Sequence, residues 1–93
     1  MRLSAGEISS IKEVIYHFDS SASIFLFGSR TYDTKKGGDI DLLVLSDTIS
    51  LDNMLKIKLN LYDRIGEQKI DLIVEKDASK PFTQMAIEKG IRL

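Results

Sequence analysis

Gly28-Ser29-Arg30 follows a short apolar run and has residue types that could bind phosphate. A glycine after a buried strand lets the backbone turn sharply and approach a ligand closely. Amides at the start of a following helical turn would point at phosphate oxygens, and the Ser29 hydroxyl and the Arg30 guanidinium could add donors. Gly-Ser by itself is an ordinary turn dipeptide, so it indicates a phosphate site only together with the residues that follow.

Three aspartates could bind divalent metal ions. Asp39 and Asp41 alternate with apolar residues in the run 39–44, and Asp71 lies in the run 70–74. Residues two apart in a strand project to one face, with α-carbons ~6.5–7 Å apart, so Asp39 and Asp41 are predicted to lie together. Ionised carboxylates this close repel each other unless a cation lies between them. If Asp71 lies on the neighbouring strand, the three carboxylates could hold two metal ions for phosphoryl chemistry.

The composition fits one small globular domain, residues 1–93, with 43% hydrophobic and 29% charged residues. No apolar stretch approaches the ~20 residues of a membrane helix, and no secretory signal is expected at the N-terminus. The absence of cysteine excludes disulfides and fits a cytoplasmic location. Without cysteine, the possible metal ligands are oxygen atoms and His17, so magnesium, manganese or calcium is favoured over zinc. A net charge of −1 gives no support to a broad nucleic-acid-binding surface.

Apolar periodicity predicts six elements in the order helix, strand, strand, helix, strand, helix. The predicted strands are residues 24–27, 40–45 and 70–74. In the second strand, Ile40, Leu42 and Val44 are expected to face the core, opposite to the aspartates. The spacing leaves open whether the first two strands form a hairpin or a crossover, and whether the second and third are parallel.

The predicted helices have recognisable ends. Ser4 and Glu7 have the spacing of a capping box, Ser50 is an expected N-cap with Gly66 as the stop, and Pro81 fits the first turn of the last helix, which ends at Gly90. The residues expected on the apolar faces are Ile8, Ile11, Val14, Ile15 and Phe18 in the first helix; Leu51, Met54, Leu55, Leu59, Tyr62 and Ile65 in the second; and Phe82, Met85, Ala86 and Ile87 in the last.

The pattern Gly28-Ser29, a spacer, then Gly38-Asp39-Ile40-Asp41-Leu42 resembles the signature of the DNA polymerase beta-like nucleotidyltransferase superfamily. The short chain is most similar to its minimal nucleotidyltransferases, the MNT or MntA antitoxin-like proteins, which pair with a small helical HEPN-type protein. The resemblance spans roughly residues 8–90. It implies an α/β (α+β) fold, a small mixed β-sheet flanked by helices that forms a nucleotidyltransferase palm-like core.

The resemblance also implies roles for single residues. Asp39 and Asp41 would bind two ions, Mg²⁺ or Mn²⁺, and Asp71 would be the third carboxylate and candidate general base. Gly28 and Ser29 would hold the triphosphate of the incoming nucleotide. The chain carries Thr31-Tyr32-Asp33 where minimal members commonly have a small residue and then glycine, so this departure bears on nucleotide affinity and not on metal binding.

Two functions follow from this reading. The first is a metal-dependent nucleotidyltransferase that transfers a nucleoside monophosphate, AMP from ATP, to a hydroxyl of a partner protein. The alternative is an antitoxin-like binding module that neutralises a helical partner by contact with little or no catalysis. A nucleotide-sugar transferase with an Asp-x-Asp loop would need a far larger fold. The chain could act as a homo-oligomer or a hetero-oligomer.

Overall fold

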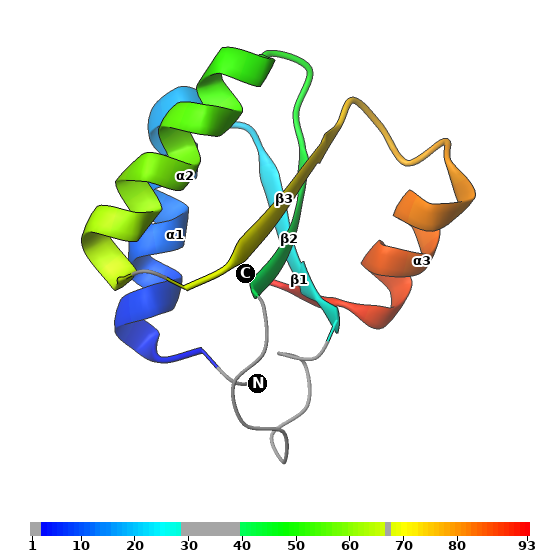
Figure 1. Cartoon of the computed structure of the whole chain (residues 1–93). Coiled ribbons are helices and arrows are strands. Elements are labelled where there is room, and N and C mark those ends of the chain that lie inside the picture. The colour runs from blue at the N-terminus through cyan, green and yellow to red at the C-terminus, as the bar shows by residue number, and fades with distance from the viewer. Residues whose placement is uncertain (1–2, 29–39, 67) are drawn as a thin grey trace.

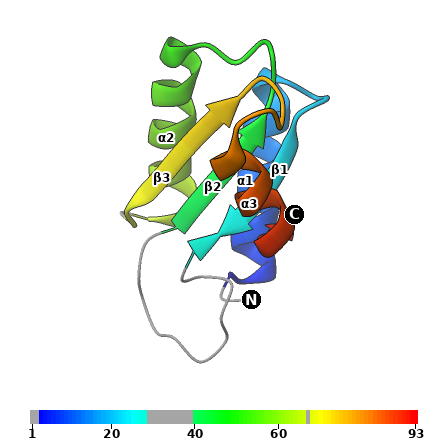
Figure 2. The same ribbon diagram turned by 90° about the vertical axis from the view of Figure 1, so that its right-hand side faces the viewer.

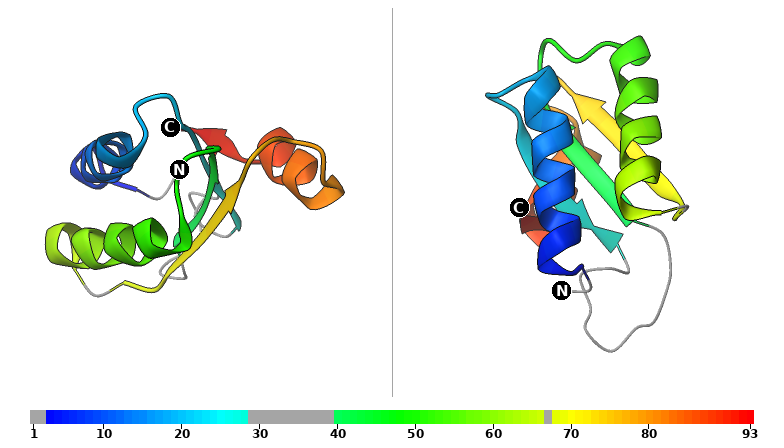
Figure 3. Two further views of the ribbon diagram at one scale, coloured as in Figure 1. Left: turned by 90° about the horizontal axis from the view of Figure 1, so that it is seen from above. Right: turned by 90° about the vertical axis from the view of Figure 1, so that its left-hand side faces the viewer.

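A computed structural model of the chain describes residues 3–28, 40–66 and 68–93. These residues form three helices and four strands, in the order α1 (Ala5–Phe18), β1 (Ser23–Phe27), β2 (Ile40–Leu45), α2 (Leu51–Ile65), β3 (Ile70–Glu75), α3 (Pro81–Lys89) and β4 (Ile91–Arg92). The sheet separates α1 and α2 on one face from α3 on the other (Figures 1 and 3). The predicted α+β class and all six predicted elements are confirmed, and β4 is an additional strand.

The sheet is mixed, with strand order β3-β2-β1-β4. β1 and β2 are antiparallel, whereas β2 and β3 are parallel because α2 returns the chain to the end of the sheet where β2 begins. β4 pairs with the outer edge of β1, where Leu26 lies opposite Ile91. Figure 2 shows β2 and β3 side by side, with α3 in front of β1 and β2. The strand spacing had left both pairings open, and the structure shows β1 antiparallel and β3 parallel to β2.

The main core lies between the sheet and the pair α1 and α2. Ile40, Leu42 and Val44 are fully buried in it, as predicted, because alternate residues of β2 face those helices. A smaller cluster on the α3 face contains Phe25, Leu43 and Ala86. The middle strands are thus buried on both faces, which explains why they read as nearly continuous apolar runs. Among the described residues, no helix has the length and apolar character needed to cross a membrane.

The predicted caps of the first two helices are present. Ser4 and Glu7 form a capping box at α1, with the Ser4 amide 2.9 Å from Oε1 of Glu7. Ser50 caps α2 and accepts a hydrogen bond from the amide of Asn53 at 3.1 Å. Gly66 ends α2 with a φ of 89°, a conformation that favours glycine.

The apolar face predicted for α2 is wrong in part. Leu51, Leu55 and Leu59 are 82%, 62% and 56% exposed, whereas the buried residues are Ile57 and Leu61. The helix carries a second apolar stripe at helical spacing, and that stripe packs against α1 and the sheet. Two stripes on one helix give the same periodicity, so spacing cannot select the inward one. The members of the second stripe are Met54, Ile57, Leu61 and Ile65.

The inward face of α3 also differs from the prediction. Phe82 and Met85, expected in the core, are 46% and 45% exposed, whereas Thr83 and Ala86 are buried. Small inward residues let α3 approach the sheet closely, and Gly90 continues this contact because a β-carbon there would lie 2.7 Å from the carbonyl oxygen of Leu26. The larger side chains of Phe82 and Met85 therefore lie beside this contact and stay partly exposed.

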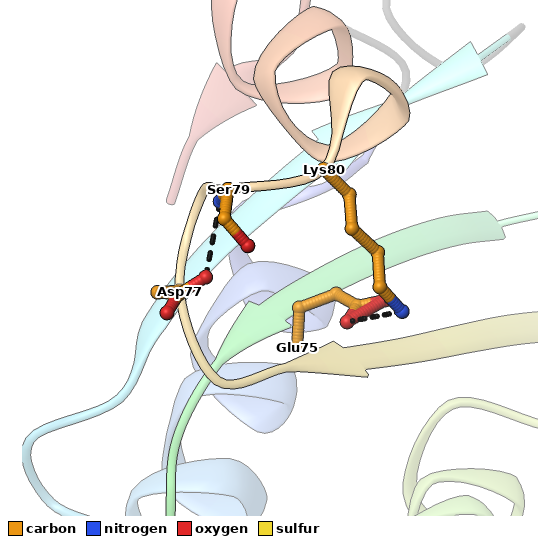
Figure 4. A network of polar contacts seen from close by, with 4 residues as sticks. All are labelled: Glu75, Asp77, Ser79 and Lys80. Carbon is orange, nitrogen blue, oxygen red and sulfur yellow. Dashed lines mark hydrogen bonds and ion pairs between the residues drawn. The ribbon is translucent and has the colours of Figure 1, made fainter.

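The turn between β3 and α3 is fixed by two polar contacts, drawn in Figure 4. The amide of Ser79 donates to Asp77 Oδ1 at 3.0 Å, and Lys80 Nζ lies 3.1 Å from Glu75 Oε1. The Ser79 hydroxyl and amide lower the pKa of the Asp77 carboxyl. This turn sets where α3 begins above the sheet.

A second polar contact joins the end of α1 to the end of β2. Asp19 accepts hydrogen bonds from the Ser46 hydroxyl and from the Ser21 amide, which lies at 2.9 Å. These donors, with Ser46 the stronger, lower the pKa of Asp19 below its ordinary value of 3.8. Because the pKa is depressed in the folded state, the contact stabilises the fold above about pH 4 and is lost as the pH falls through the folded pKa.

Replacing Ser46 by alanine is expected to lower the melting temperature at pH 7, and the difference from the wild type should shrink below about pH 4 as Asp19 is protonated. Thermal unfolding followed by circular dichroism between pH 2.5 and 7 measures this. Ser50→Ala is the matched control, because its bonds to Asn53 involve no carboxylate and its cost should not change with pH. A Ser46→Ala cost that stays constant across this range would contradict the assignment.

Thr83 supplies a second stability test, because its Oγ1 is buried and has no hydrogen-bond partner within the described part of the chain. Valine has nearly the same shape and no hydroxyl, so Thr83→Val should stabilise the fold by about 1 kcal/mol, as seen by urea denaturation. Thr83→Ala is the control and should destabilise, since it leaves a cavity. Destabilisation by valine would mean that the hydroxyl is hydrogen-bonded in solution.

Candidate active site

Asp41 and Asp71 lie directly beside each other on β2 and β3, where the parallel register pairs them. Their α-carbons belong to strands that pack ~4.8 Å apart. Each aspartate comes two residues before an apolar residue of the α3 face, Leu43 or Ile73, so both project from that face. Both are partly buried. The condition that Asp71 lie on the neighbouring strand is therefore met.

Gly28 packs against the carboxylate of Asp41. A β-carbon built on Gly28 would overlap Asp41 Oδ2 and would lie 3.1 Å from its Cγ. The φ of Gly28 is 79°, a left-handed conformation that side chains disfavour. The preceding residue, Phe27, pairs with Asp41 in the antiparallel register. The end of β1 therefore brings a backbone without a side chain to the carboxylate, as a close approach to phosphate would require.

The other predicted site residues, Ser29, Arg30 and Asp39, lie in the segment 29–39, outside the described residues, as does Asp33. Their roles stay predictions. No group of three or more histidine, cysteine, aspartate or glutamate side chains gathers at a possible metal site within the described ranges 3–28, 40–66 and 68–93. Asp41 and Asp71 alone of the three predicted carboxylates fall within those ranges.

The two described carboxylates fit a divalent metal. Like charges on directly opposite residues of neighbouring strands destabilise a sheet, and a cation between them removes the repulsion. Carboxylate oxygens are the ligands that magnesium and manganese prefer. Gly28 itself adds no side chain beside the Asp41 carboxylate. Asp41 and Asp71 are thus the described residues that would hold the ion.

Two aromatic residues beside the carboxylates were not predicted as part of the site. Phe27, Asp41 and Asp71 form one row across three strands, on the face that α3 covers. The ring of Phe82, from the first turn of α3, lies edge-to-face against Phe27 with centroids 5.7 Å apart. The apolar periodicity of α3 gave no signal of this position, because the contact depends on how the helix crosses the sheet.

Comparison with known proteins identifies the chemistry that this arrangement can serve. The family model "Polymerase beta, Nucleotidyltransferase" matches residues 9–93. The chain belongs to this nucleotidyltransferase family. The predicted resemblance is therefore confirmed for the family, and membership of the minimal antitoxin-like group stays a prediction.

A crystal structure of a protein described provisionally as a nucleotidyltransferase has the same fold. It superposes with a TM-score of 0.65 and 22% sequence identity, over 96% of this chain and 99% of that one. Comparison with curated proteins gave no match. As a member of its family, the chain is a nucleotidyltransferase, an enzyme class that generally uses a nucleoside triphosphate and a divalent metal.

The position of Gly28 in this nucleotidyltransferase yields a test. Gly28→Ala should lower stability by roughly 1–2 kcal/mol through its left-handed backbone, and should also displace the Asp41 carboxylate. We expect Mg²⁺ or Mn²⁺ to raise the melting temperature of the wild type, and we expect this rise to be largely lost in Gly28→Ala. Differential scanning calorimetry with and without the ion measures both effects.

Gly66→Ala is the matched control for this experiment. Gly66 also has a positive φ, 89°, but a β-carbon there would meet nothing within 4 Å. Gly66→Ala should therefore lower the stability of the protein but keep the rise in melting temperature that the cation gives. Retention of that rise by Gly28→Ala would contradict the proposed closeness of Gly28 to the metal site.

Proposed function

We propose that this nucleotidyltransferase transfers a nucleoside monophosphate, AMP from ATP, to a hydroxyl of a partner protein. The observation that carries the proposal is the register that sets Asp41 beside Asp71, with Gly28 against the Asp41 carboxylate. Carboxylates at this spacing, in an enzyme family that uses nucleoside triphosphates and divalent metals, support metal-assisted attack on a phosphate.

Each site residue then has a proposed role. Asp41 and Asp71, together with Asp39, would hold two ions, Mg²⁺ or Mn²⁺. Such ions neutralise charge on the triphosphate and on the leaving pyrophosphate. Asp71 would accept the proton of the acceptor hydroxyl, whose oxygen displaces pyrophosphate at the α-phosphorus. Gly28 would give the triphosphate access to the backbone, and Ser29 and Arg30 would donate hydrogen bonds to it.

The proposed acceptor is a protein because the domain exposes a surface that could contact one. The leucine stripe on α2, formed by Leu51, Leu55 and Leu59, is apolar and largely exposed. Exposed apolar side chains gathered on one face are typical of sites of protein association. The proposed partner is a small helical HEPN-type protein. The same stripe supports the second candidate function, an antitoxin-like module that neutralises this partner by contact.

Asp41→Asn and Asp71→Asn separate the two candidates. Labelled ATP and magnesium are incubated with the protein, alone and with the product of the adjacent gene. Transfer of label to that product should fall about hundredfold or more in both variants, since each loses a charge worth several kcal/mol of transition-state stabilisation. Asp47→Asn, an exposed aspartate after β2, is the control and should leave transfer unchanged.

A tight complex that shows no transfer, and that forms equally with the two asparagine variants, would exclude the enzymatic proposal and favour the binding module. Leu55→Lys then identifies the surface. It should weaken the complex without changing the binding of ATP, because Leu55 belongs to the leucine stripe on α2 and the carboxylates project from the opposite face of the sheet.

A further inference from the structure

We propose that the ring of Phe82 forms the surface on which the nucleobase of the substrate stacks. The inference rests on the proposed function and extends it, because it assigns a substrate-binding residue outside the carboxylates and the glycine turn. It also predicts that the enzyme binds the base through its ring face and discriminates little between the polar edges of different bases.

The position of Phe82 follows from three contacts. Phe27 is paired with Asp41, and Asp41 with Asp71, so an aromatic ring and two carboxylates form one row on the α3 face. Phe82 lies edge-to-face on Phe27, with centroids 5.7 Å apart and an interplanar angle of 82°. A nucleotide whose phosphates lie at the carboxylates would therefore have an aromatic wall at the β1 side of the row.

Core packing does not account for Phe82. Thr83 and Ala86 occupy the inward positions of α3, and the side chain of Phe82 remains 46% exposed. An edge-to-face pair uses the face of one ring and the edge of the other, so ring surface remains for a further contact. Phe27 holds the Phe82 ring in place before a ligand binds, which lowers the entropic cost of stacking.

Among the described polar side chains close to Phe82 in the chain, the Thr83 hydroxyl is buried, and Lys80 and Gln84 are already engaged. Lys80 Nζ lies 3.1 Å from Glu75 Oε1, as Figure 4 shows, and Gln84 Nε2 donates to the carbonyl oxygen of Ala78 at 2.9 Å. Neither donor is held toward the exposed ring. Stacking on an aromatic side chain tolerates any base, since every base has a π-face. We therefore expect purines to bind more tightly than pyrimidines, through their larger rings, and adenine and guanine to bind alike.

The test is isothermal titration calorimetry with magnesium and each of ATP, GTP, CTP, UTP and inorganic tripolyphosphate. In Phe82→Ala, the Kd for ATP and GTP should rise roughly 5- to 100-fold, the range for loss of one base–aromatic stack. The Kd for tripolyphosphate should stay unchanged, since it has no base. Phe82→Trp keeps an aromatic ring at this position and should bind ATP about as well as the wild type does. Met85→Ala is the matched control, because Met85 is 45% exposed on the same helix and should leave all five affinities unchanged.

Three results would overturn the inference. Unchanged ATP affinity in Phe82→Ala, with a wild type that binds ATP, excludes stacking and leaves the proposed function intact. If Phe82→Ala lost affinity for ATP and for tripolyphosphate equally, Phe82 would have a structural role only. Phe82→Leu keeps an apolar contact with Phe27 and tests whether that loss of affinity comes from disturbed packing. A wild type that binds neither ATP nor tripolyphosphate would instead exclude the proposed function, and the inference with it.

Discussion

The parallel register between β2 and β3 is the constraint on which the site depends, because it holds two like charges side by side. For charges ~5 Å apart in a medium of effective dielectric constant ~20, the repulsion is on the order of 3 kcal/mol. The opposite face of the same strands buries Ile40, Leu42 and Ile70 almost completely, at about 1.5–3 kcal/mol each. Burial therefore outweighs the repulsion, and the sheet can hold the two carboxylates side by side.

Close packing against glycine is the second requirement, and it occurs at two places. Gly28 brings the end of β1 against Asp41, and Gly90 brings the end of α3 against Leu26 of the same strand. A side chain would displace the Asp41 carboxylate at the first position and the backbone of β1 at the second. The antiparallel pairing of β1 with both β2 and β4 then links the two contacts, so that the position of α3 and that of the carboxylates are set by a single strand.

Much of the fold could be predicted from local signals. The strands that carry Asp41 and Asp71 are recognisable in the sequence as apolar runs. The capping serines Ser4 and Ser50 indicate where two helices begin. The faces of α2 and α3 could not be predicted, because Leu55 and Ile57 both belong to apolar stripes and only packing against α1 decides between them. The pairing of Asp41 with Asp71 depends on the direction of the crossover, and the place of Phe82 on how α3 crosses the sheet. Both depend on tertiary structure, which local sequence patterns do not predict.

The two faces of the sheet differ in how many buried residues they hold, and this difference affects the dynamics of the fold. The α1–α2 face holds most of the buried residues of the described chain, whereas the buried members of the cluster on the α3 face are Phe25, Leu43 and Ala86. Segments with few buried contacts open at lower free energy than the core. Local opening should therefore detach α3 and β4 while the strands that carry Asp41 and Asp71 stay folded. Phe82, on α3, is then held less firmly than Asp41 and Asp71, which stay on the folded strands.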